Sequence, residues 1–293
     1  MITWLQPRHF ERRYGNFLKK TNAQLKKEFL LRLGLIIKLQ TLISYQESLE
    51  DDTELKANQE KLKEEENNLF LWWLAFKSQV FYTVSGYFSV VNLYNDKQFQ
   101  AVIKSATGLS IPPTRTAGYT NNLYSSYNDI ADKFGDTADI YRTEPFLDGV
   151  EKNWRTTQES YIDKTVTQTI IDSISIIRGS LITADVAKTI LNKINTKFES
   201  VDKSLFRFGS DQIDKLDSQL TTKRQQSLGL KDYVWDTQKD ERVRGNPNGL
   251  YPNARPSHYA RQGLIFSWNK PPEGGAPGEA QGCRCRPKMR LPR

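Results

Sequence analysis

Apolar residues recur at steps of three and four positions along the first part of the chain. Between Tyr14 and Ser44 this spacing predicts a helix with one apolar face, while lysines fall largely on the opposite side. Such a helix either packs within the protein or docks onto a partner, and packing is the ordinary outcome for this pattern. From Gln46 to Asn68 charged and amide side chains dominate, which predicts an exposed helix or a charged connector.

The stretch from Leu69 to Val91 is rich in aromatic and aliphatic residues and approaches the length of a membrane span. Lys77, Ser78 and Gln79 interrupt its middle, and such residues are costly in hydrocarbon. We therefore predict a buried aromatic core and keep membrane insertion as the alternative. Where these aromatics are exposed, they form a candidate docking surface for a partner protein, made of Phe70, Trp72, Trp73 and Phe76.

The pattern changes again in the second half. Pro, Gly and Asn break the sequence between Gly108 and Gly149, and helical spacing returns over 148–180, 183–198 and 201–228. Gly229 follows the last helix, where a left-handed residue is favoured. Short strands are expected at 233–235 and 264–266 because these residues are aromatic or aliphatic.

These elements predict an α+β protein, with a predominantly α-helical body and a small, turn-rich α+β module at the C-terminus. We divide the chain into a helical and aromatic attachment region (1–107), a loop-rich connector (108–147) and a C-terminal domain (148–293). Within that domain, helices run to about 228 and short strands and loops fill 229–293. The opening of the chain lacks the pattern of a secretory signal, so we expect a protein made and kept in a cytoplasm.

Positive charge is concentrated at the C-terminal end. Residues 223–293 contain 14 Lys and Arg against six Asp and Glu, which equals the +8 net charge of the whole chain. The same segment holds eight of the 12 prolines and eight of the 17 glycines. A basic, turn-rich segment fits contact with nucleic acid or with an acidic protein surface, and charge alone does not distinguish the two.

The two cysteines, Cys283 and Cys285, form a Cys-Arg-Cys sequence. A disulfide between them would close a very small, strained ring, and a reducing cytoplasm would keep both as thiols. With His258 and one of Asp236 or Asp240, they supply the ligand types of a zinc site. Cys-x-Cys is a less usual zinc spacing than Cys-x-x-Cys, so the default expectation is no cofactor and two buried structural thiols, with zinc as the alternative.

Enzyme chemistry has weaker support. The side chains of His258, Asp236, Asp240, Glu279 and Cys283 include a nucleophile, a base and an acid, but no recognisable spacing orders them. The chain shows no phosphate-binding glycine loop and no nucleophile elbow. We therefore expect a protein that is not an enzyme.

Several short motifs follow one another toward the C-terminus. In chain order they are Asp211-Gln212 and Lys215-Leu216, Trp235-Asp-Thr237, Arg242-Val-Arg244, Pro256-Ser-His258 and Cys283-Arg-Cys285. This order resembles the phage Mu F-like minor head proteins, also called the phage head morphogenesis family, over about Thr183 to Pro287. Two features depart from the family pattern: the loop Gly245 to Ala254 is inserted, and Ser210 stands where relatives often have Arg.

The resemblance implies a virion structural protein of a tailed phage. Such a minor head protein is made in the host cytoplasm, lies near the portal inside the capsid and acts in head morphogenesis, with a further role in DNA packaging or ejection. The implied partners are the portal protein, other capsid or head proteins and packaged double-stranded DNA, with a membrane not expected. The alternatives are a delivered effector enzyme, such as a nuclease or NAD-consuming toxin, and a membrane-active ejection protein.

For contact with DNA phosphates or an acidic partner, the candidate residues are the basic side chains of the C-terminal segment. They are Arg242, Arg244, Arg255, Arg261, Arg284, Arg286, Lys288 and Arg290.

Overall fold

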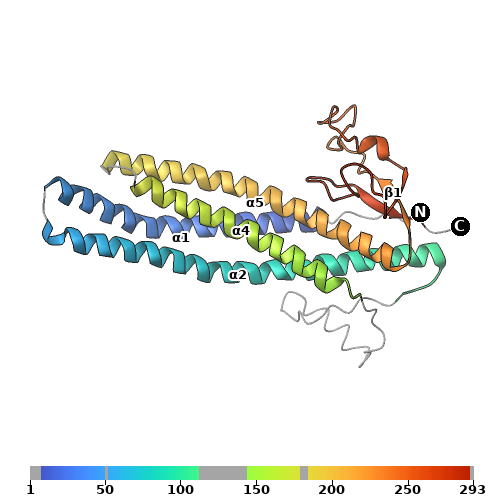
Figure 1. Ribbon diagram of the computed structural model, residues 1–293, viewed down its shortest axis with the longest axis horizontal. Helices are drawn as coiled ribbons and strands as arrows, with labels where there is room; N and C mark the ends of the chain where they lie inside the picture. The colour runs from blue at the N-terminus through green and yellow to red at the C-terminus, as the bar shows by residue number, and fades with distance from the viewer. Residues whose placement is uncertain (1–7, 50–51, 112–143, 179–183, 291–293) are drawn as a thin grey trace, which may run out of the picture. The chain divides into compact units, whose positions relative to one another are not determined.

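The computed structural model describes residues 8–49, 52–111, 144–178 and 184–290. Four long helices make up most of these residues (Figure 1). They are α1 (Arg8–Ser48), α2 (Asp52–Thr107), α4 (Leu147–Arg178) and α5 (Ala184–Ser227). A C-terminal module, residues 229–290, follows with three short strands and the 3₁₀ turn η2 (Tyr259–Arg261). The predicted fold class, mostly helical with a small α+β module, is confirmed.

The helices are longer and fewer than the sequence pattern predicts. The charged segment 46–68 and the aromatic segment 69–91 lie mostly in the single helix α2, and the separate helices predicted at 183–198 and 201–228 form one helix, α5. No Pro or Gly interrupts α5 between residues 198 and 201, so the backbone hydrogen bonds continue through the junction. Most of the predicted connector, residues 112–143, lies outside the described residues.

Contacts divide the chain into two units that cut across the helices. We call Tyr14–Val84 with Thr156–Phe208 the helical unit, and Met1–Arg13, Ser85–Arg155 and Gly209–Arg293 the sheet-bearing unit. The division predicted from the sequence, 1–107, 108–147 and 148–293, gave each region one continuous segment. The contacts instead group segments that are far apart in sequence.

The helical unit has an apolar core to which each of its four helix segments contributes. Phe29 of α1 packs against Phe198 of α5, with 5.3 Å between their ring centroids. Asn22 is also buried, and its amide donates to the carbonyl oxygen of Phe198 and to Asp202. The buried apolar residues of α1 repeat at helical spacing, as the sequence pattern predicts: Leu18, Leu25, Phe29, Leu33, Ile36 and Ile43.

The sheet-bearing unit contains a three-stranded antiparallel sheet in the order β2-β1-β3. The strands are β1 (Asp232–Asp236), β2 (Ile265–Ser267) and β3 (Arg286–Met289). Tyr233 and Trp235 alternate inward along β1 and are fully buried, which confirms the predicted strand there. Gly229, with φ of 75°, follows α5 as predicted.

The third strand follows the Cys-Arg-Cys sequence. β3 starts at Arg286, directly after Cys285. The two cysteine side chains belong to the buried cluster of Tyr233, Trp235 and Ala276. They therefore lead into the strand and contribute to the core of the module.

Hydrogen bonds fasten the C-terminal module to the second half of α5. Gln225 donates to the carbonyl oxygen of Pro287 at 2.7 Å, and Ser218 donates to that of Pro277 at 2.6 Å. The backbone N–H of Gly282 donates to Asp211 at 2.5 Å. Asp211 and the residues beside it thus form the helical side of the module.

In the ranges that the structure describes, no helix is both long enough and apolar enough to span a membrane.

Candidate metal centre

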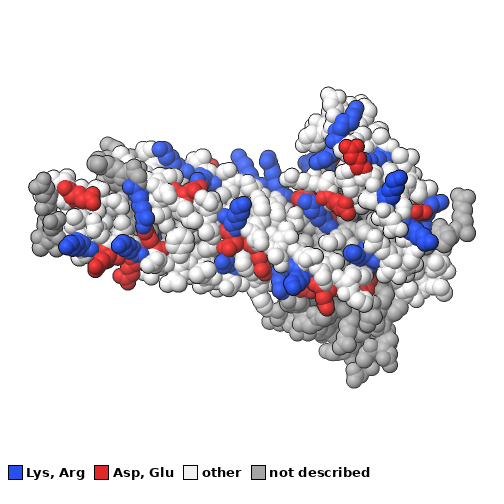
Figure 2. All heavy atoms as spheres, viewed as in Figure 1, with Lys and Arg blue, Asp and Glu red and all other residues white. Residues whose placement is uncertain are grey.

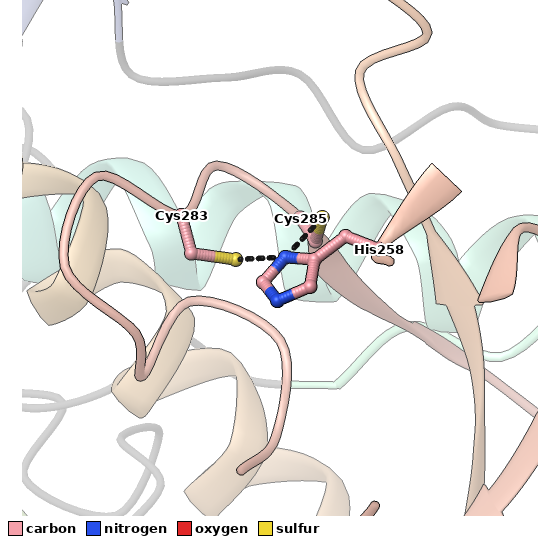
Figure 3. A group of neighbouring side chains, drawn as sticks. All are labelled: His258, Cys283 and Cys285. Carbon is pink, nitrogen blue, oxygen red and sulfur yellow. Dashed lines mark hydrogen bonds between the residues drawn. The ribbon is translucent and has the colours of Figure 1, made fainter. Parts of the chain in front are cut away.

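Three potential metal ligands meet inside the C-terminal module: His258, Cys283 and Cys285 (Figure 3). His258 directly precedes η2, and the two cysteines directly precede β3. Residues two apart in an extended segment point to the same side, which suits a Cys-x-Cys pair that faces one partner. Arg284, between the cysteines, forms an ion pair with Asp240.

The imidazole ring is oriented toward both sulfur atoms. Nδ1 of His258 lies 3.3 Å from Sγ of Cys283 and 3.7 Å from Sγ of Cys285 (Figure 3). The three ligand atoms all lie within 4.8 Å of one another. All three side chains are buried, with 2–4% of their surface exposed. The sequence proposed these residues as ligands, and the structure brings them together.

The surroundings favour a negatively charged sulfur at Cys283. The backbone N–H of Gly278 donates to its Sγ at 3.4 Å. A hydrogen bond from Cys285, opposed by burial and assisted by His258, lowers the pKa of Cys283 to about 4. The hydrogen bond to Cys283 and burial raise the pKa of Cys285. These contacts therefore favour the deprotonated form at Cys283 and the protonated form at Cys285.

The two aspartates proposed as a fourth ligand have other partners. Asp236 accepts from Gln262 at 3.0 Å, and Asp240 pairs with Arg284. Within the described part of the chain, neither joins the cluster of three. Glu279, considered for enzyme chemistry, accepts from the backbone N–H of Ala276 at 2.7 Å. A hollow of about 20 Å³ adjoins the cluster, lined in part by Arg242, Val243 and Arg244.

The eight basic residues proposed to contact phosphates do not form one surface. Arg242, Arg255 and Arg290 are exposed, and Arg290 pairs with Asp232 at 3.0 Å. Arg244, Arg284 and Lys288 are half-buried. In the space-filling view, Lys and Arg are interspersed with Asp and Glu over the face drawn (Figure 2).

Two of the eight are interior residues, so their predicted contact with DNA or an acidic partner is wrong. Arg286 is 2% exposed and pairs with Asp214 and Asp217 of α5. Arg261 lies over the Trp235 ring, 4.9 Å from its centroid, and donates to the carbonyl oxygen of Glu273. Both guanidinium groups hold the module together, and neither is placed to reach a phosphate.

Sequence reasoning missed a third buried arginine, Arg224. It lies in the last turn of α5, where a basic residue usually sits at the surface and balances the helix dipole. Here it is fully buried and donates to Glu144, Asn92 and Asn95. No signal in the sequence separates it from its exposed neighbour Lys223.

The aromatic docking surface proposed on α2 is only partly available. Trp73 is 2% exposed and its indole N–H donates to Thr167 at 3.1 Å, so the prediction that it docks a partner is wrong. Phe70, Trp72 and Phe76 are half-buried, and Trp72 stacks on Phe76. The exposed apolar side chains nearby are Leu71 and Leu74.

Comparisons with known proteins yield one distant relative. It is an uncharacterized protein of Haemophilus influenzae, to which the chain is 30% identical over 129 residues. The match covers 44% of this chain, which spans a quarter of the relative's length. No family model matches the chain. No solved structure matches it either.

Proposed function

We propose that this chain is a minor head protein of a tailed phage, similar to the Mu F-like family. It is made in the host cytoplasm and acts in head morphogenesis near the portal, inside the capsid, with a role in DNA packaging or ejection. The support is the order of motifs from Asp211 to Cys285 described above.

One structural observation carries the proposal: motifs that are distant in sequence contact one another in the C-terminal module. Asp211 accepts from Gly282, Asp240 pairs with Arg284, and His258 faces Cys283. These pairs are 71, 44 and 25 residues apart. The motifs that carry the resemblance therefore form a single folded frame, as expected if they mark a structural module.

Two surfaces are the proposed partner contacts. Arg242 and Arg255 are exposed and form no ion pair within the described residues, so they are the basic side chains best placed for DNA phosphates. Leu71 and Leu74 of the helical unit are 62% and 48% exposed and are the proposed contact for the portal or another head protein.

The direct test is mass spectrometry of purified phage particles before and after genome ejection. We expect the chain in DNA-filled particles, with an abundant cytoplasmic protein of the same lysate as the negative control. Loss on ejection would indicate delivery with the DNA, and retention would indicate a fixed place near the portal. Absence from particles at every stage would overturn the proposal.

DNA contact has its own test. Replacing Arg242 and Arg255 by Gln should weaken binding to duplex DNA of any sequence. The slope of log Kd against log salt concentration should also fall by about two. Lys61→Gln with Lys63→Gln removes the same charge from exposed positions of α2 and is the matched control. Equal salt slopes for the two double variants would mean that this surface meets protein and not DNA.

Portal contact is tested with single substitutions. Leu71→Glu or Leu74→Glu should reduce copurification with the portal protein of the same phage, because a charge replaces an apolar contact. Leu191→Glu, at a 36% exposed leucine of α5, is the control. If all three variants copurify equally, α2 is not the contact surface.

A further inference from the structure

We propose that His258, Cys283 and Cys285 bind one Zn²⁺ ion, which ties the loop before η2 to the segment before β3. The proposal goes beyond the virion role and does not depend on it. It rests on geometry, on the chemistry of the ligands and on the small core of the module.

The ligand spacing fits zinc. Tetrahedral coordination with Zn–S of about 2.3 Å and Zn–N of about 2.0–2.1 Å places a ligating sulfur and nitrogen about 3.5 Å apart. In the structure, Nδ1 of His258 lies 3.3 Å from one sulfur and 3.7 Å from the other. An ion between the three atoms therefore needs only small side-chain adjustments.

The donor set also fits zinc better than the other common metals. Two sulfurs and one imidazole nitrogen are borderline-soft ligands that suit Zn²⁺, whereas Mg²⁺ and Ca²⁺ require oxygen. The N–H of Gly278 already donates to Cys283, as is common around a metal-bound thiolate. Cysteine binds zinc as the thiolate, so any proton that a ligating sulfur carries is released to solvent when the metal binds.

The adjoining hollow is lined by all three ligands, so it can hold a fourth. Its volume of about 20 Å³ is sufficient for one water molecule. Asp240 does not take this position because it pairs with Arg284. Three protein ligands and one water complete a tetrahedral site.

A metal at this position would do structural work. The apolar cluster of the module contains Tyr233, Trp235, Ala276 and the two cysteines themselves. Small modules with few buried apolar residues commonly need a metal or disulfides in addition to their core. The zinc would join two segments that lie outside the strands, the one before η2 and the one before β3.

The experiment uses the full chain, purified under reducing conditions. We expect about one zinc per chain by elemental analysis, and, after exchange with cobalt chloride, the thiolate-to-cobalt charge-transfer band of a two-sulfur tetrahedral site. Cys283→Ser, Cys285→Ser and His258→Ala should each weaken metal affinity about 100-fold or more. Val243→Ala alters a buried residue that lines the same hollow but offers no ligand, and it should retain full metal content.

A second measurement keeps the proposal testable where a ligand variant fails to fold. Removing zinc from the unaltered protein with a chelator should speed backbone hydrogen exchange in residues 229–290, and adding zinc chloride should restore protection. Exchange in the helical unit should not change. Metal-free protein that forms no cobalt–thiolate band and whose exchange is unaffected by zinc would overturn the proposal. Particle incorporation tests the virion role separately, so failure of one proposal leaves the other intact.

Discussion

The two units of the protein bury different kinds of side chain. In the described part of the helical unit, Glu66 is the one charged residue that is buried, and it pairs with Arg178. The sheet-bearing unit buries seven: Asp96, Glu144, Asp214, Asp217, Arg224, Arg261 and Arg286. The helical unit is therefore held mainly by apolar packing, whereas the sheet-bearing unit depends on ion pairs and hydrogen bonds.

The lengths of the elements explain one part of the difference, the ion pairs that join the C-terminal module to α5. Long amphipathic helices present continuous apolar faces that cover one another. Strands of three to five residues cover much less surface, so the loops of the C-terminal module are fixed by polar side chains. Buried charges stabilise only when each is fully paired, so the sheet-bearing unit should tolerate the loss of a single partner poorly.

The largest expected effect comes from removing the most extensively bonded buried charge. Arg224→Met should lower the free energy of unfolding by about 4 kcal/mol, because the buried carboxylate of Glu144 loses its ion pair with Arg224. Urea unfolding measures the loss of stability, and hydrogen exchange shows which unit it affects. Lys223→Met removes the same charge from an exposed neighbour and should have little effect. Equal losses in the two variants would contradict a structural role for the buried pair.

The apolar core of the helical unit should respond next. Leu33→Ala removes a fully buried side chain and should cost about 3 kcal/mol. The loss should appear as faster hydrogen exchange in the helical unit, with the C-terminal module unaffected. Leu31→Ala, at a 68% exposed position of the same helix, is the control. Faster exchange spread equally over both units would remove the distinction between them.

The close approach of the module to α5 can be tested at Gly278. Its φ is +87°, and an added Cβ would lie 2.3 Å from Oγ of Ser218, so Gly278→Ala should cost about 2 kcal/mol. Gly263 has φ of +78° with nothing within 4 Å, so Gly263→Ala carries the backbone strain alone. The difference between the two, measured by thermal unfolding, reports the contact. No difference would mean that the loop does not approach the helix closely.

The smallest effect is expected at Tyr233, whose buried hydroxyl has no hydrogen-bond partner among the described residues. Tyr233→Phe should change stability by less than about 1 kcal/mol at pH 7. Burial, assisted by Glu279, raises the pKa of Tyr233 from 10.0 to about 12. The folded state thus holds the hydroxyl proton of Tyr233 more tightly than the unfolded state does. The stability that this adds is complete below pH 10 and is lost as the pH rises to about 12.

Unfolding followed between pH 9 and 12 checks this dependence. The unaltered protein should lose more stability over that range than Tyr233→Phe. Tyr82→Phe, at a 61% exposed tyrosine, should behave as the unaltered protein does. Parallel pH curves for all three proteins would show that Tyr233 is accessible to solvent.

Local pattern predicted the elements well where side chains repeat at a regular spacing. The apolar positions of α1 and the alternation of Tyr233 and Trp235 in β1 are set by neighbouring residues, so the sequence reveals them. The break predicted between 198 and 201 is wrong, because α5 continues through it. Helices end where the backbone cannot continue, and no such residue stands there.

The candidate site was predicted in its residues and not in its geometry. His258, Cys283 and Cys285 stand out because the chain contains two histidines and two cysteines. Their separation along the chain gave no distance, and the predicted fourth ligands Asp236 and Asp240 proved to have other partners. Which carboxylate pairs with which basic side chain is decided by how segments that are distant in sequence pack together.

The sequence by itself determined which segments are helical, the basic C-terminal module and the residues able to bind a metal, because these follow from spacing, composition and side-chain chemistry. Only the tertiary structure decided that Arg224 and Arg286 are interior residues while Arg242 and Arg255 remain exposed. The physical reason is that a guanidinium group has the same charge in both places. Whether it meets solvent or a buried carboxylate depends on how distant segments pack.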